Sequence, residues 1–211
     1  MSIGRQIDHI VYAVPDLKAA CQDLEEKLGQ APLFGGYHPR YGTKNAVLNL
    51  GDECYLEILA VDEKNPNVSA PRWMGVDLID KPHVTRWALK SDDLAADGEV
   101  LRGYDSQMGK VQGGQRLTAD GKLFAWEMQV PLAEPAVEIM PFMIDWQLSA
   151  SHPCDALEEK CKLIGIHLGH PDPGQMEDKL KELGIHIRVE ASESPFIQIE
   201  IDSPNGRVKL G

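Results

Sequence analysis

IDHIVYAVPDL, residues 7–17, begins like a buried β-strand and ends like the entrance to a helix. β-Branched and aromatic residues fill its first half, which is typical of strands. The Pro-Asp pair then precedes a segment with apolar residues at helical spacing, which predicts a helix that Gly29 ends. His9 interrupts the apolar strand. Because a buried imidazole without a partner costs free energy, we expect a partner or a ligand beside His9.

The same pattern returns further along the chain. Strand, Pro-Asp, helix and Leu-Gly recur almost element for element at residues 162–184, and more loosely from residue 83. The repeat predicts an α+β protein of repeated βαβββ units in one compact assembly. The expected parts are a first unit at 1–62, a linker at 63–82, a strand-rich middle unit at 83–146, a linker at 147–161 and a last unit at 162–211.

The composition narrows the function classes. The formal net charge of −12 argues against a surface that follows nucleic-acid phosphates. No apolar run is long enough for a membrane span, and the first residues do not form a signal peptide, so we expect a cytoplasmic protein. The four cysteines have no CxxC spacing, and nucleotide-loop or serine-hydrolase motifs do not occur. The expected partner is therefore a small molecule.

The segment GTKNAVLNLGDECYLEILAVD, residues 42–62, together with DHI, RWALKSDDL, PFMIDW and LGHPDP, resembles the vicinal oxygen chelate superfamily, in particular its glyoxalase-like domain proteins. The resemblance implies curled mixed sheets around a cavity. It also implies that the first and fourth strands of each unit offer a metal ligand, typically His or Glu. The implied cofactor is a divalent ion, Zn, Mn, Fe or Ni, that acts as a Lewis acid.

On this resemblance, His9 and Glu57 are the expected metal ligands, and Glu57 is also the expected catalytic residue. A catalytic site needs at least a third protein ligand. Arg86 and Gly165 stand where the other units would supply it, so His167, on the same strand face as Gly165, is the candidate third ligand. That set requires the first and last units to pair. Asp145 in PFMIDW is the other candidate.

A metal-free arrangement is an equal alternative. Arg86 could form a bidentate pair with Glu57 and occupy the place of the metal. The cavity would then bind a polar metabolite, with Arg40, Asn45, Arg86 and Trp126 as the expected substrate-binding residues.

Two functions follow from these alternatives. The first is a small-molecule enzyme, a metal-dependent lyase, isomerase or dioxygenase that acts on a small oxygenated metabolite. The second is a metal-free protein of the same fold that binds or sequesters such a molecule. Because an odd number of units leaves an unpaired strand edge, a homodimer is a further expectation.

Overall fold

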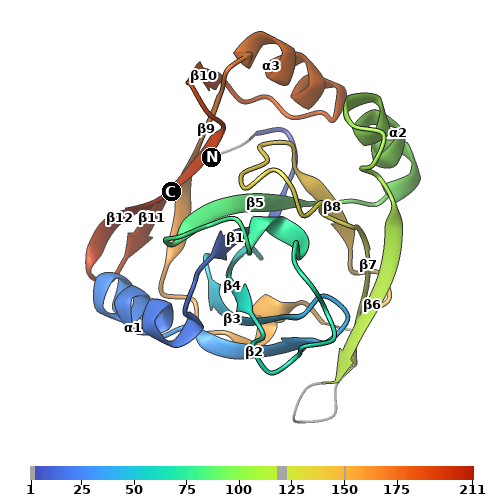
Figure 1. Ribbon diagram of the computed structural model, residues 1–211. Helices are drawn as coiled ribbons and strands as arrows, with labels where there is room; N and C mark the ends of the chain where they lie inside the picture. The colour runs from blue at the N-terminus through green and yellow to red at the C-terminus, as the bar shows by residue number, and fades with distance from the viewer. Residues whose placement is uncertain (1–2, 118–122, 150) are drawn as a thin grey trace.

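The computed structural model describes residues 3–117, 123–149 and 151–211, and within them the order β-α-β-β-β occurs three times (Figure 1). The first set is β1 (Ile7–Ala13), α1 (Leu17–Leu28), β2 (Leu33–His38), β3 (Thr43–Asn49) and β4 (Tyr55–Val61). The second is β5 (His83–Lys90), α2 (Leu94–Tyr104), β6 (Val111–Leu117), β7 (Leu123–Gln129) and β8 (Phe142–Asp145). The third is β9 (Lys162–His170), α3 (Pro173–Glu182), β10 (Val189–Ala191), β11 (Phe196–Ser203) and β12 (Gly206–Leu210). Short 3-10 turns, η1 (Trp73–Gly75) and η2 (Pro153–Ala156), lie in the connections.

The first two sets form one eight-stranded mixed sheet in the order β2-β3-β4-β1-β5-β8-β7-β6. At its centre β1 and β5 run antiparallel, and each also pairs in parallel with the fourth strand of its own set. The sheet curls around its own inner face (Figure 1). This arrangement confirms the expected α+β fold with repeated units in a curled sheet.

The third set forms a separate four-stranded sheet in the order β10-β9-β11-β12. Here β9 lies between β10 and β11, whereas the corresponding strand β1 pairs with the fourth strand of its set, β4. The last set therefore repeats the order of the elements without repeating their pairing. The first and last sets do not share a sheet, so the pairing on which the His167 ligand set depends does not occur.

Two apolar clusters divide the faces of the large sheet. Ile10, Leu56 and Trp87 belong to a cluster that also contains the buried residues of the helices and of the second sheet. Val11 and Ala88 belong to a second cluster inside the curl. Because side chains alternate along a strand, His9 shares its face with Val11 and points into the curl.

The helices are positioned by local sequence signals. Each α-helix of the described chain begins after an aspartate whose side chain accepts a backbone N–H, and these are Asp16, Asp93 and Asp172. Such N-caps satisfy donors that the first helical turn leaves free. Gly29 ends α1 at a φ of 70°, a left-handed conformation that suits glycine. In the described part of the chain, none of the helices has the length and apolar character needed to cross a membrane.

Candidate functional site

The curl of the large sheet encloses a cavity of about 300 Å³. Its walls are mainly apolar and aromatic, and they include Trp73, Met74, Trp126, Met128, Ile144 and Trp146. His9, Asn45 and Glu57 bring polar groups to the lining from three neighbouring strands, β1, β3 and β4. A cavity that is mostly apolar with a few convergent polar groups is the usual form of a small-molecule site.

His9 is held between a carboxylate and the cavity. Its side chain is 4% exposed, its ring stacks on Tyr55 at 4.7 Å between centroids, and the edge of Phe142 lies 5.3 Å away. Nδ1 of His9 lies 2.6 Å from Oδ1 of Asp8, and Nε2 lies 3.8 Å from Oε2 of Glu57. If the proton of the neutral ring is on Nδ1 and donates to Asp8, Nε2 has no proton, and it is this nitrogen that faces Glu57.

A bulge in β1 brings Asp8 into this arrangement. Ile7 lies opposite Leu89 and His9 opposite Ala88, so Asp8 is an extra residue in the pairing with β5. Such a bulge changes the direction of a side chain that would otherwise alternate to the other face. It explains how two consecutive residues of one strand contact each other in the interior.

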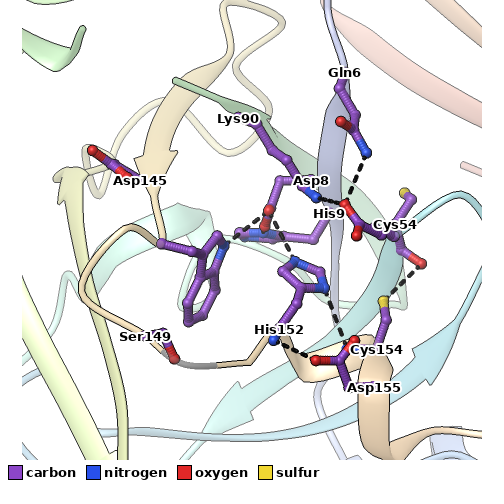
Figure 2. Close-up of polar contacts among 12 residues, drawn as sticks. Gln6, Asp8, His9, Cys54, Lys90, Asp145, Ser149, His152, Cys154 and Asp155 are labelled. Atoms are coloured by element: carbon purple, nitrogen blue, oxygen red, sulfur yellow. Dashed lines mark hydrogen bonds and ion pairs between the residues drawn. The ribbon is translucent and has the colours of Figure 1, made fainter. Parts of the chain in front are cut away.

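Asp8 is fully buried and accepts three hydrogen bonds (Figure 2). Besides His9, the donors are Nε2 of His152 at 3.1 Å and Nε1 of Trp146 at 2.9 Å. Burial alone would raise the pKa of Asp8, but hydrogen bonds and charge interactions with His152 and His9 outweigh it and lower the pKa to about 2. Asp8 is therefore an anion at neutral pH.

His152 comes from the connection before β9. Its Nδ1 accepts the backbone N–H of Cys154 at 3.3 Å, and its own backbone N–H donates to Asp155. Because Nδ1 accepts, Nε2 carries the proton and donates to Asp8. Neither Asp8 nor His152 was among the predicted site residues. Two consecutive polar residues in an apolar strand were a usable signal for Asp8, but His152 lies in a polar connection that has no comparable signal.

Glu57 and Asn45 form the second polar pair of the cavity. Both are buried, with exposed fractions of 6% and 5%, and Nδ2 of Asn45 donates to Oε1 of Glu57 at 2.7 Å. In the described part of the chain, no group donates to Oδ1 of Asn45. The polar end of the cavity therefore contains a buried carboxylate and an amide oxygen without a protein donor.

The structure corrects the expected pairing of Arg86 with Glu57. The Arg86 guanidinium donates to the backbone carbonyls of Leu132, Pro135 and Ala136 and is not among the residues that line the cavity. Burial lowers its pKa to about 10, so it remains a cation at neutral pH. Arg86 fixes the connection before β8 and does not replace a metal.

The other two proposed ligands lie elsewhere. His167 is on β9 in the second sheet, with 41% of its side chain exposed, and its Nε2 lies 3.5 Å from Glu200. Asp145 accepts the backbone N–H of Gln147, and Figure 2 shows it apart from the contacts around Asp8. Neither residue lines the cavity. The structure does not bring His167 or Asp145 to His9 and Glu57.

The pairing of the central strands shows what the second half of the sheet supplies instead. His9 lies opposite Ala88, and Val11 lies opposite Arg86. If the half of the sheet that contains β1 is superimposed on the half that contains β5, His9 corresponds to Arg86 and Val11 corresponds to Ala88. The sequence alignment of His9 with Arg86 agrees with this match.

The match extends to the fourth strands. Val11 is paired with Glu57 and Ala88 with Phe142, so Phe142 occupies the position that corresponds to Glu57. An arginine and a phenylalanine are not metal ligands. Within the described residues, no group of three or more His, Cys, Asp or Glu side chains is arranged to hold a metal ion. The residues at these positions therefore do not supply the three protein ligands that a catalytic divalent metal needs.

The remaining predicted residues lie on the cavity. Arg40 and Tyr41 line it from the turn after β2, and Trp126 lines it from β7. Tyr41 stacks on Trp73 with 3.6 Å between centroids, and the Gln112 amide contacts the hydroxyl of Tyr41 and the guanidinium of Arg40. Three of the four predicted substrate-binding residues, Arg40, Asn45 and Trp126, thus face the same space.

A family model and one solved structure with a similar fold agree with this architecture. A family model described as a glyoxalase-like domain matches residues 7–184. A hypothetical protein from Staphylococcus aureus has a similar structure, with a TM-score of 0.66, 16% sequence identity and 98% of each chain covered. A methylmalonyl-CoA epimerase from Mycobacterium tuberculosis gives a TM-score of 0.43 at 18% identity, over 69% of this chain and 90% of its own. No curated protein shows a significant match.

Proposed function

The chain belongs to the glyoxalase-like domain family, and on that premise we propose that it is a small-molecule enzyme that transfers a proton on a small oxygenated metabolite without a metal ion. The reaction class is that of an isomerase or lyase. The observation that carries the proposal is the position of His9, whose Nδ1 contacts Asp8 while its Nε2 faces Glu57 in the cavity.

His9 is the proposed general base. In the neutral ring, a proton on Nδ1 leaves a lone pair on Nε2, the atom that can accept a proton from a bound molecule. The Asp8 carboxylate would fix this tautomer and stabilise the imidazolium that forms, as an aspartate does in catalytic triads. Apolar walls strengthen these charge interactions because they exclude water.

Glu57 is the proposed second acid–base group. Its Oε2 lies 3.8 Å from Nε2 of His9, so both groups can contact the same small molecule. The hydrogen bond from Asn45 to Oε1 orients the carboxylate and leaves Oε2 on the side of His9. Nε2 of His9 takes the proton from one atom of the molecule, and the imidazolium that forms returns it to a second atom. The Glu57 carboxylate can carry the proton between the two atoms, so the step needs no other proton source.

A metal-free binding protein is the second candidate. The aromatic side chains around the cavity, with the stacked pair of Tyr41 and Trp73, favour tight enclosure of a flat molecule. This function needs no chemistry at His9. It predicts that a ligand raises the melting temperature without any proton exchange.

Solvent exchange tests the proposal without knowledge of the natural substrate. The protein, treated with chelator, is incubated in D₂O with hydroxyacetone, pyruvate, 2-oxobutyrate and methylmalonate, and the loss of each α-proton signal is followed by proton NMR. We expect accelerated exchange for at least one compound. The His9→Gln variant should lose roughly 10²- to 10⁴-fold of that rate, as expected for removal of a general base.

His167→Gln is the matched control, because it makes the same change on a histidine outside the cavity. It should exchange at the rate of the unaltered protein. If no compound exchanges faster than in buffer, or if His9→Gln exchanges as fast as the unaltered protein, proton transfer by His9 is contradicted.

A further inference from the structure

Three acceptors gather at the end of the cavity that β1, β3 and β4 form, whereas Arg40 lines the cavity from the turn after β2. Glu57 presents carboxylate oxygens, Asn45 presents its amide oxygen, and Nε2 of neutral His9 is an acceptor because Nδ1 donates to Asp8. Their positions on neighbouring strands β4, β3 and β1 bring them together.

The orientation of the Asn45 amide is fixed by its partner. Nδ2 lies 2.7 Å from Oε1 of Glu57, and the opposite orientation would bring two acceptor oxygens together. Oδ1 of Asn45 is therefore the atom of the amide that does not contact Glu57. In the described part of the chain it has no donor, and the residue is only 5% exposed. A buried acceptor without a donor is unfavourable, and such atoms in native proteins need an explanation.

The protein elsewhere satisfies a comparable amide fully. Asn49, on the same strand and 4% exposed, donates to the carbonyls of Cys154 and Leu157 and accepts the backbone N–H of Gly51. Asn49 does not line the cavity, whereas Asn45 does. Among the described residues, Oε1 of Gln30 and Oε1 of Gln129 also lack a donor, but neither glutamine lines the cavity. Asn45 is thus the amide of these three that a ligand in the cavity can reach.

We infer that the polar end of the cavity, Asn45 with Glu57, selects a ligand by hydrogen bonds that the ligand donates, through hydroxyl or amino groups on a flat apolar body. The inference rests on the proposed use of this cavity as a ligand site, but it does not need proton transfer by His9. The apolar body follows from the walls, where Trp73, Trp126 and Trp146 offer ring faces and edges. An ether or a carboxylate beside Oδ1 of Asn45 and Oε2 of Glu57 would place an acceptor against these acceptors.

Four probes of nearly equal size separate the possibilities. Benzyl alcohol and benzylamine carry hydrogen-bond donors. Benzyl methyl ether carries only a hydrogen-bond acceptor, and benzoate is an anion. Their dissociation constants for the chelator-treated protein are measured by ligand-observed NMR. The two donor compounds should bind at least about tenfold more tightly than the ether and benzoate, which corresponds to about 1.4 kcal/mol. The ratio between the alcohol and the amine distinguishes a hydroxyl ligand from an amino ligand.

Asn45→Leu should reduce the preference for donors to within about threefold, and the matched variant Asn49→Leu should keep it. Equal or tighter binding of the ether or benzoate to the unaltered protein overturns the inference, as does the absence of binding by all four probes. The comparison of probes on the unaltered protein decides the matter even where a variant does not fold. Because binding is measured without turnover, a failure of the exchange experiment leaves this result intact.

Discussion

Strands β1 and β9 have similar local sequences and different surroundings. β1 contains His9 and β9 contains His167 and His170, and each strand is followed by a Pro-Asp pair whose aspartate caps a helix. His9 on β1 lies inside the curled sheet with Asp8 and Glu57, and 4% of its side chain is exposed. His167 on β9 lies near Glu200 at the surface, and 41% of its side chain is exposed. The repeat therefore specifies the elements, while the pairing of strands decides which histidine can serve a site.

The difference arises from the neighbours of each strand. β1 is enclosed by β4 and β5 within a sheet of eight strands, and the connection before β9 adds His152 and the segment after β8 adds Trp146. β9 also has two neighbouring strands, β10 and β11, but they belong to a sheet of four strands. Loss of a contact of His9 should lower the free energy of unfolding more than loss of a contact of His167. An exposed ion pair contributes little to stability, whereas removal of one partner of a buried pair leaves an uncompensated charge in the interior.

Removal of the acid that contacts each histidine should give the largest difference. Asp8→Ala leaves three buried donors without their acceptor and should lower the free energy of unfolding by about 3–5 kcal/mol. Glu200→Ala should lower it far less, because solvent screens the contact between His167 and Glu200, whose side chains are 41% and 24% exposed. Urea unfolding measures both. Equal losses in the two variants would show that the buried cluster has no special contribution.

Lowering the pH should also reduce the free energy of unfolding through Asp8, by less than the Asp8→Ala substitution does. The folded protein lowers the pKa of Asp8 from 3.8 to about 2, so its stabilisation is complete above about pH 4 and is lost as the pH falls toward 2. The shift corresponds to about 2 kcal/mol. The difference in unfolding free energy between the unaltered protein and Asp8→Asn should shrink by that amount from pH 5 to pH 2. A difference that is independent of pH would contradict the low pKa.

The smallest expected effect comes from His152. His152→Leu removes one of three donors to Asp8, which should raise the pKa of Asp8 and cost about 1 kcal/mol of stability. Because His9 keeps its own hydrogen bond to Asp8, proton exchange should fall only about tenfold, an estimate from the value of a single hydrogen bond. Urea unfolding and the D₂O exchange rate measure the two effects. A loss of exchange as large as in His9→Gln would mean that His152 itself reacts.

Local signals predicted much of the fold and several of the residues that line the cavity. The Pro-Asp helix entrances, the apolar strands and the repeat are encoded within short segments, and His9 and Glu57 stand where the resemblance implies. The direction of Asp8 depends on a bulge against β5, and the contact between Asp8 and His152 joins residues 144 positions apart. The pairing of the first unit with the middle unit in one sheet also depends on contacts between residues far apart in the sequence. Sequence spacing alone does not contain these contacts, which is why His167 and Arg86 were assigned roles that the structure does not support.

On the proposed function, Asp8 holds Nδ1 of His9 and Nε2 faces the cavity without binding a metal ion. Long-range ¹H–¹⁵N NMR of the histidine rings tests it, at a pH that leaves His9 neutral, with Zn²⁺ added up to one equivalent. We expect a proton on Nδ1 of His9 and no saturable shift of its Nε2. A shift of Nε2 that saturates at one equivalent of Zn²⁺ and disappears in Glu57→Gln would contradict it.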